Sequence, residues 1–208
     1  MPPLDELIIG FDRALRTLAA PARECRPSPA RTVPDTVLSP SEKDHVARLM
    51  RINHTGEVCA QALYQGQALT ARVSANREAL QGGAREEEDH LAWCEARIKE
   101  LGGRVSYLNP FWYASSLALG VLAGVAGDRW NLAFLKETER QVEGHLAHHL
   151  DQIPAADART RAVIEQMKTD EAGHADLAQS LGAAEFPQPI KWAMALSSKV
   201  MTRTVYWV

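Results

Sequence analysis

Two Glu-x-x-His pairs constrain the fold of this chain more than any other feature of its sequence. The first pair is Glu87 and His90, in the segment AREEEDHLAW, and the second is Glu171 and His174, in TDEAGHADL. A glutamate and a histidine three residues apart project from the same side of an α-helix, close enough to bind one metal ion. The pairs therefore predict helices that carry metal ligands on one face.

Each pair is preceded by a further glutamate at a similar distance. Glu57 lies 30 residues before Glu87, and Glu143 lies 28 residues before Glu171. One glutamate from each of two helices, with Glu-x-x-His from each of two others, is the ligand set of ferritin-like di-iron and di-manganese proteins. The arrangement predicts an all-α fold, a ferritin-like four-helix bundle.

Apolar residues recur at helical spacing over four long segments. The expected helices cover about 39–73, about 76–101, a segment that ends at Ile153 before Pro154, and about 157–181. Ser39 and Glu42 have the spacing of a capping box, with Pro40 at the first helical position. No segment shows the sustained alternation that is typical of a strand.

Glutamates interrupt these apolar stripes. An unpaired buried carboxylate costs several kcal/mol or loses its charge, so several of them facing one core require compensation, which two cations would supply. On the third helix, Glu139 and Glu143 lie on the same face one turn apart, and spacing alone does not decide which of them is a ligand. The interrupting residues are Glu57, Glu87, Glu139, Glu143 and Glu171.

The N-terminal part differs from the rest of the chain. Residues 4–19 have the apolar spacing of an amphipathic helix, and residues 21–40 contain five prolines, which is typical of an extended linker. We therefore divide the chain into an N-terminal amphipathic helix and Pro-rich linker, residues 1–38, and a ferritin-like domain, residues 39–208.

Composition excludes some classes of function and location. The formal charge of −3 gives no electrostatic reason to expect nucleic-acid binding. Three cysteines without a Cys-x-x-Cys motif suit a reducing compartment, and the first residues resemble neither a secretory signal nor a transit peptide. We expect the cytoplasm or its membrane face.

The segment from Tyr107 to Gly127 contains no charged residue. By length it could cross a bilayer, but crossing would place the metal ligands before and after it on opposite sides of the membrane. We therefore expect a helix that lies in the membrane interface, and the alternative is a long buried core helix. Residues 187–208, which combine Trp and Tyr with basic residues, are a second candidate for a membrane-facing helix.

Several segments together resemble the demethoxyubiquinone hydroxylase family of ubiquinone biosynthesis, over about residues 40–208. They are NHTGEVCAQALYQGQ, EEEDHLAWCEARIKELGGR, FWYASSLALGVLAG, VEGHLAHHLDQI and DEAGHADL. The resemblance implies a non-haem di-iron monooxygenase that uses O₂ to hydroxylate the ring of a polyprenyl 5-demethoxyquinone. It also implies a peripheral protein on the cytoplasmic side of the cell membrane.

Carried over by motif, the resemblance implies six ligands for two iron ions per subunit, and no other catalytic residue. The motif V-E-x-x-x-A-H-H selects Glu143 over Glu139, and Glu87 and Glu171 are the expected bridging ligands. Some members have tyrosine after the His-His pair, where this chain has Leu150, while Tyr64 has the same offset from Glu57 that Leu150 has from Glu143. The implied ligands are Glu57, Glu87, His90, Glu143, Glu171 and His174, and the candidates for groups that contact them are His149, His148, Tyr64 and Asp170.

The expected partners are the quinone, O₂, a membrane surface and an electron donor. Because the chain has no nucleotide-binding glycine motif, the electrons would come from NADH without a Rossmann site, from a separate reductase, or through the quinone itself. A homo-oligomer or a biosynthetic complex is left open. Three other functions use the same fold: iron oxidation and storage, a non-catalytic quinone-binding scaffold, and a di-manganese or iron–manganese oxidase.

Overall fold

A computed structural model describes residues 3–208, so Met1 and Pro2 of the N-terminal segment lie outside the described part. The described residues form helices and no strand, which confirms the all-α prediction. The helices are α1 (Pro3–Ala19), the short 3-10 helix η1 (Pro29–Thr32), α2 (Pro40–Thr70), α3 (Ser74–Glu100), α4 (Asn109–Val125), α5 (Asp128–Gln152), α6 (Ala158–Ser180) and α7 (Gln188–Val205).

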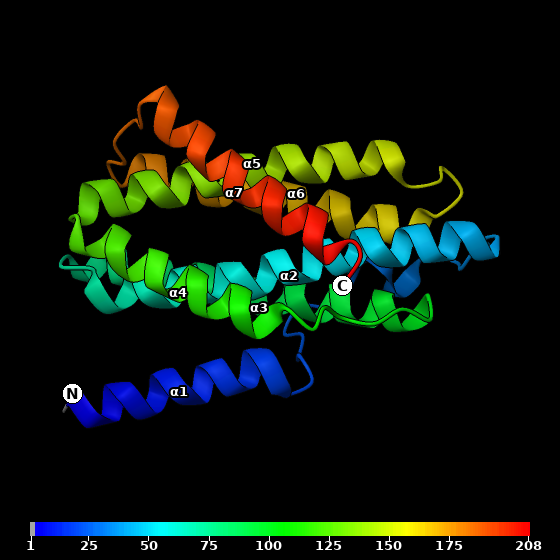
Figure 1. Ribbon diagram of the computed structural model, residues 1–208, viewed down its shortest axis with the longest axis horizontal. Coiled ribbons are helices and arrows are strands. Elements are labelled where there is room, and N and C mark those ends of the chain that lie inside the picture. The colour runs from blue at the N-terminus through cyan, green and yellow to red at the C-terminus, as the bar shows by residue number, and fades with distance from the viewer. Residues whose placement is uncertain (1–2) are drawn as a thin grey trace.

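The four long helices α2, α3, α5 and α6 form the bundle (Figure 1). α2 packs on α3 and α5 packs on α6, and short loops make each pair an antiparallel hairpin. α4 connects the two hairpins and lies along α2, while α7 crosses the outer face of the bundle. α1 lies alongside α2 and α4 (Figure 1).

The helix ends follow the local sequence. The Ser39 hydroxyl accepts a hydrogen bond from the Glu42 N–H, and the Glu42 carboxylate accepts one from the Ser39 N–H at 2.8 Å, which confirms the capping box. Gly102 and Gly182 follow α3 and α6 with φ of 74° and 95°, a conformation that glycine adopts without steric cost. The observed helices agree with the expected ranges within three residues.

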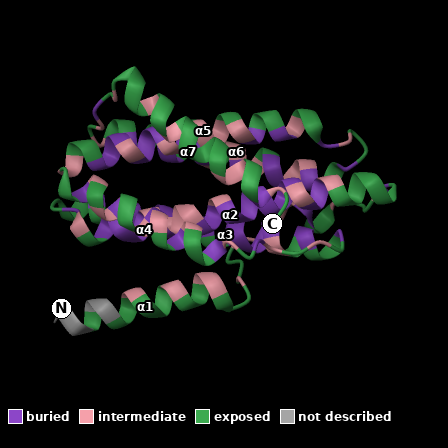
Figure 2. Cartoon of the chain, viewed as in Figure 1, coloured by how far each residue is buried: buried purple, intermediate pink, exposed green. Residues whose placement is uncertain are grey.

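Buried residues lie on the inward-facing turns of the bundle helices (Figure 2). One apolar cluster contains Met50, Trp93 and Met167, and a second contains Tyr64, Leu80 and Leu135. Along the sequence of each helix, Glu57 of α2, Glu87 of α3 and Glu139 of α5 lie between residues of the first cluster and residues of the second. The polar site therefore occupies the middle of the bundle, between two apolar layers.

α4 is neither a buried core helix nor long enough to span a membrane. Gly120 and Gly124 face α2, while Phe111 and Leu122 are 61% and 64% exposed. Among the described residues, no helix combines the length and hydropathy needed to cross a bilayer. The alternative of a fully buried core helix over 107–127 is therefore wrong, because one side of α4 packs on α2 and the other side is free.

The Pro-rich linker packs on the bundle. Ala30 and Leu38 belong to the first apolar cluster, and Arg26 forms an ion pair of 2.8 Å with Asp89 of α3. The boundary between residues 1–38 and 39–208 is therefore a change of composition that does not interrupt the packing.

Candidate metal centre

Six buried side chains from four helices meet in the middle of the bundle. They form two groups, and in each group the candidate ligand atoms all lie within 4.8 Å of one another. α2 contributes one glutamate, α3 a glutamate and a histidine, α5 one glutamate, and α6 a glutamate and a histidine. The first group is Glu57, Glu87, His90 and Glu171, and the second is Glu87, Glu139, Glu171 and His174.

Glu87 and Glu171 belong to both groups, whereas each of the other four residues belongs to one. This is the arrangement expected of two adjacent metal ions with two bridging carboxylates and one terminal Glu/His set each. The structure thus places Glu87 and Glu171 where the sequence-based interpretation put the bridging ligands.

Glu143 is half-buried and lies in neither group, and Glu139 takes its place. The choice of Glu143 from the motif alignment is therefore corrected by the geometry. The physical reason is the register of α5. The inward-facing residues of this helix follow one another at alternating intervals of three and four residues, and this series contains positions 139 and 142 but not position 143. The series is Leu132, Leu135, Glu139, Val142 and Leu146.

Each histidine points one ring nitrogen into the site and the other at a carboxylate outside it. His90 Nδ1 lies 3.0 Å from Glu87 and 3.3 Å from Glu171, while its Nε2 lies 3.0 Å from Asp170. His174 Nδ1 lies 3.2 Å from Glu87, and its Nε2 lies 3.2 Å from Glu86. Such outer carboxylates fix the ring orientation of metal-binding histidines.

The two carboxylates that contact the outer nitrogens of the histidines occupy equivalent positions in α3 and α6. Asp170 precedes Glu171 and holds the histidine of α3, and Glu86 precedes Glu87 and holds the histidine of α6. Asp170 was among the predicted contacting groups, but Glu86 was missed. Its position directly before a ligand, equivalent to that of Asp170, is the sequence signal that identifies it.

The linker supplies an outer layer on one side. Arg26 lies 2.9 Å from Asp170 and 2.8 Å from Asp89, and its guanidinium lies over the Trp93 ring at 5.1 Å. A chain of contacts thus runs from the linker through Asp170 to His90. Nothing in the spacing of the linker sequence pointed to Arg26.

The remaining predicted neighbours divide into one that touches the site and two that do not. The Tyr64 hydroxyl donates a 2.7 Å hydrogen bond to Glu139. His148 is exposed, and His149 is buried against the His145 ring at 4.0 Å; neither belongs to a ligand group.

Burial and mutual repulsion control protonation of the metal-free site. Burial, together with the charge of Glu87, raises the pKa of Glu57 well above its ordinary value, and burial and the charge of Glu171 do the same to the pKa of Glu139. Although burial opposes it, hydrogen bonds to Glu171 and Glu87 raise the pKa of His174 to about 12. Burial also acts to lower the pKa of His90, but the charge of Glu87 raises this pKa well above its ordinary value.

The donor set fits a pair of metal ions. Oε1 of Glu87 and Oε1 of Glu171 are buried and accept no well-directed hydrogen bond, although each lies 3.2 or 3.3 Å from a histidine Nδ1, and buried carboxylate oxygens are normally satisfied. These oxygens belong to the two residues shared by both groups. Carboxylate and imidazole ligands suit iron or manganese, and cations would satisfy these two oxygens.

We predict that metal binding releases protons. The raised pKa values of His90, His174, Glu57 and Glu139 mean that these groups bind protons more tightly in the metal-free protein than free side chains do, and ligands must be deprotonated to bind. Metal affinity should therefore increase as the pH rises. Calorimetric titration with Fe²⁺ in two buffers of different ionisation enthalpy measures the release, and equal heats in both buffers would contradict it.

A cavity of about 650 Å³ lies between α1, the linker, α2 and α3, and it reaches Tyr64. Since Tyr64 also contacts Glu139, the cavity approaches the metal centre from the side covered by α1. Its charged lining consists of four arginines and two acidic residues, and Asp12 pairs with Arg16 at 2.7 Å. These residues are Arg13, Arg16, Arg23, Arg85, Asp12 and Glu88.

The whole chain is similar to known proteins of ubiquinone biosynthesis. The family model described as "Ubiquinone biosynthesis protein COQ7" matches residues 44–205. Similar proteins named 3-demethoxyubiquinol 3-hydroxylase include one from Nitrosomonas europaea, which is 62% identical over 99% of both chains. Another, from Nitrosospira multiformis, is 58% identical over the full length of both chains. The chain therefore belongs to the COQ7 family of ubiquinone biosynthesis proteins.

Proposed function

We propose that this protein is the hydroxylase of ubiquinone biosynthesis that adds a hydroxyl group to a demethoxyubiquinol ring, using two iron ions and O₂. The observation that carries the proposal is the pair of buried Glu/His groups that share Glu87 and Glu171, in a chain whose relatives are named 3-demethoxyubiquinol 3-hydroxylase. Those names specify the reduced ring and number its position 3, whereas the sequence-based expectation was a 5-demethoxyquinone.

When bound, a pair of ferrous ions supplies two electrons for the reduction of O₂ and for transfer of one oxygen atom to a ring carbon. Glu57, His90, Glu139 and His174 would hold the ions individually, and Glu87 and Glu171 would bridge them. The residue types alone suit manganese as well, and iron is proposed because the reaction requires activation of O₂.

The surrounding side chains keep the residues of this site oriented. Asp170 and Glu86 hold the outer nitrogens of the two histidines, so that Nδ1 of each ring faces the carboxylates. Tyr64 holds Glu139 by donating its hydroxyl proton, and burial and the charge of Glu139 raise the pKa of Tyr64 well above its ordinary value, so it stays a donor. The apolar clusters pack on two sides of the site.

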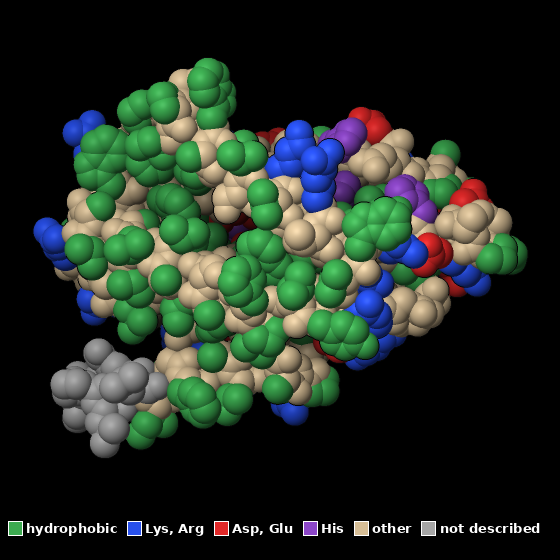
Figure 3. Space-filling view, viewed as in Figure 1, with side chains coloured by type: hydrophobic (Ala, Val, Ile, Leu, Met, Phe, Trp, Pro, Cys, Tyr) green, Lys and Arg blue, Asp and Glu red, His purple; other side chains and the backbone are tan. Residues whose placement is uncertain are grey.

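The substrate carries a polyprenyl tail, so we propose that the protein takes it from the cytoplasmic surface of the cell membrane. Exposed apolar side chains of α1, α4 and α7 gather on one side of the molecule, the apolar face (Figure 3). Figure 3 also shows a hollow between α4 and α7 with acidic and histidine side chains at its bottom. The exposed large apolar side chains of these helices and of the segment after α7 include Phe11, Leu15, Phe111, Leu119, Leu122, Val125, Ile190, Trp192, Leu196, Val200 and Trp207.

Charges placed on the apolar face are expected to weaken membrane binding. Leu122→Asp and Trp192→Asp change side chains that are 64% and 66% exposed, so the fold should survive. Each should weaken vesicle binding at least about tenfold, since a buried large apolar side chain contributes about 1.5–3 kcal/mol. Val37→Asp, at a linker position that is 98% exposed, is the control. Unchanged vesicle cosedimentation of the α4 and α7 variants would contradict the proposal.

The electron donor remains a prediction. An anionic donor such as NADH could bind without a Rossmann glycine motif in the cavity that reaches Tyr64, because its lining has four arginines and two acidic residues. A homo-oligomer or a complex with other enzymes of the pathway likewise remains a prediction.

The function is tested by anaerobic Fe²⁺ loading, followed by a short-chain demethoxyubiquinol, a reductant and O₂. The hydroxylated product should appear only with iron, and Glu171→Ala should abolish it because a bridging ligand is lost. Oxidation of the iron without turnover of the quinol would instead favour the storage function. Binding of the quinol without either reaction would favour the scaffold.

A further inference from the structure

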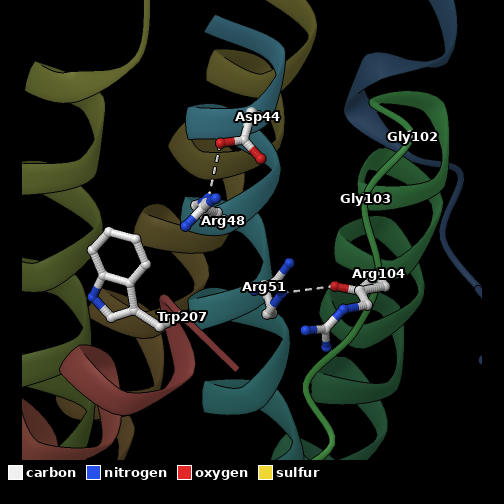
Figure 4. A pocket seen from close by; sticks show the side chains of 7 residues that line it. All are labelled: Asp44, Arg48, Arg51, Gly102, Gly103, Arg104 and Trp207. Atoms are coloured by element: carbon white, nitrogen blue, oxygen red, sulfur yellow. Dashed lines mark hydrogen bonds and ion pairs between the residues drawn. The ribbon is translucent and has the colours of Figure 1, made fainter. Parts of the chain in front are cut away.

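A second pocket lies at the end of the bundle, outside the metal centre. It has a volume of about 360 Å³ and lies between the first turns of α2, the loop that follows α3 and the end of α7 (Figure 4). Its lining residues are Asp44, Arg48, Arg51, Gly102, Gly103, Arg104 and Trp207.

Positive charge dominates this pocket. The lining contains three guanidinium groups and one carboxylate. This carboxylate belongs to Asp44 and forms an ion pair of 2.9 Å with Arg48. Within the described residues, neither Arg51 nor Arg104 forms an ion pair with an acidic side chain. Arg104 Nη1 instead donates to the backbone oxygen of Val208, the last residue, at 2.6 Å, so the charge of this pocket that no acidic group contacts is centred on Arg51.

Arg51 is the most unusual of these groups because its side chain is buried. It is only 8% exposed, and its guanidinium donates to the backbone oxygens of Arg104 at 2.8 Å and Tyr206 at 3.4 Å. Burial, with the like charges of Arg104 and Arg48, lowers the pKa of Arg51. A buried cation is normally paired with an anion, so this arrangement is favourable when an anion occupies the pocket.

Aromatic contacts hold the other two arginines in place. The Arg48 guanidinium lies over the rings of Tyr206 at 5.3 Å and Trp207 at 5.0 Å, and the Arg104 guanidinium lies over Tyr107 at 4.2 Å. Arginine side chains fixed in this way present planar donors that match phosphate oxygens.

The pocket is also adjacent to the apolar face. Trp207 lines the pocket and is 70% exposed, and Tyr107, which holds Arg104, is 74% exposed. Aromatic side chains of this kind lie at the headgroup level of a bilayer. An anion at this position would therefore be level with lipid headgroups if the apolar face rests on a membrane.

We propose that Arg48, Arg51 and Arg104 bind the phosphate of an anionic lipid headgroup. The proposal rests on the membrane association proposed above and adds a specific partner to it. The pocket then orients the protein on the membrane, because it fixes the end of α7 to one lipid while α4 and α7 contact the acyl region.

Vesicle binding tests this proposal with three compositions: phosphatidylcholine alone, phosphatidylcholine with phosphatidic acid, and phosphatidylcholine with oleate at the same surface charge. The protein should prefer the phosphatidic acid vesicles over the oleate vesicles. Arg51→Gln and Arg104→Gln should each weaken phosphatidic acid binding about tenfold, the loss expected for one hydrogen bond to a charged group. Circular dichroism checks that both variants fold. Arg104 is exposed, so Arg104→Gln should fold and still test the proposal if Arg51→Gln is unstable.

Arg203→Gln is the matched control, since it removes one exposed positive charge from α7 outside the pocket. It should reduce binding to both anionic vesicles equally and leave the preference for phosphatidic acid intact. Soluble phosphate should compete with phosphatidic acid vesicles for the unmodified protein, whereas chloride at equal ionic strength should not.

Three results would overturn the proposal. One is equal binding of phosphatidic acid and oleate vesicles; another is a preference for phosphatidic acid that survives in both pocket variants. The third is a site for free phosphate alone. In that case phosphate would quench the fluorescence of Trp207, an effect absent in Trp207→Phe, and the protein would show no preference for phosphatidic acid vesicles over oleate vesicles. Failure of the proposed membrane association is distinguishable, because then Leu122→Asp also leaves vesicle binding unchanged.

Discussion

Glu139→Gln is expected to lower metal-dependent hydroxylation at least about 100-fold, because even residues that only contact metal ligands change affinity or activity by about 10–100-fold. The substitution keeps the shape of the side chain and an oxygen that can accept the Tyr64 hydrogen bond, so the bundle should fold normally. The readouts are Fe²⁺ stoichiometry, measured anaerobically, and the rate of quinol hydroxylation.

Glu143→Gln is the matched comparison, since it makes the same chemical change one turn further along α5. Glu143 is half-buried and outside both ligand groups, so activity should stay within about twofold of the unmodified protein. If Glu143→Gln lost the metal and Glu139→Gln did not, the register of α5 described above would be wrong.

Gly120→Ala is expected to destabilise the protein by about 2–3 kcal/mol through overpacking between α4 and α2. A Cβ at position 120 would lie 3.1 Å from the Leu63 Cα and 3.2 Å from the Gln67 N, and it would come closer still to the Leu63 carbonyl oxygen. All of these are backbone atoms of α2, so only a displacement of one helix can relieve the contact.

Gly144→Ala makes the same change in α5, where a Cβ would meet nothing within 4 Å. There the substitution should stabilise the protein by about 0.5–1 kcal/mol, because alanine favours the helix more than glycine. The free energy of unfolding in denaturant measures both effects. Equal changes at the two positions would show that α4 does not pack on α2 as described.

Much of the fold and most of the metal centre could be predicted from the sequence. Glu87, His90, Glu171 and His174 were identified because helical spacing alone brings each Glu-x-x-His pair to one face, whatever the rest of the fold does. The helix ends were predictable for a similar local reason, since a capping box and glycines after helices act within one turn.

The features that were missed depend on register or on distant packing. Glu139 and Glu143 are separated by one turn, so spacing left both open and a motif alignment selected Glu143, whereas the structure places Glu139 among the candidate ligands. Arg26 reaches the centre from a linker that carries no periodic signal, because its position depends on ion pairs with Asp89 and Asp170, far away in the sequence.

The origin of the oxygen atom in the product is the most direct test of the proposal that this protein hydroxylates the quinol ring with O₂. The iron-loaded protein is mixed with a short-chain demethoxyubiquinol and ¹⁸O₂ in unlabelled water, and the ring is analysed by mass spectrometry. We predict that each product molecule contains one ¹⁸O atom in its new hydroxyl group. Oxidation of the iron with no labelled quinol, or a hydroxyl oxygen derived from water, would contradict the account.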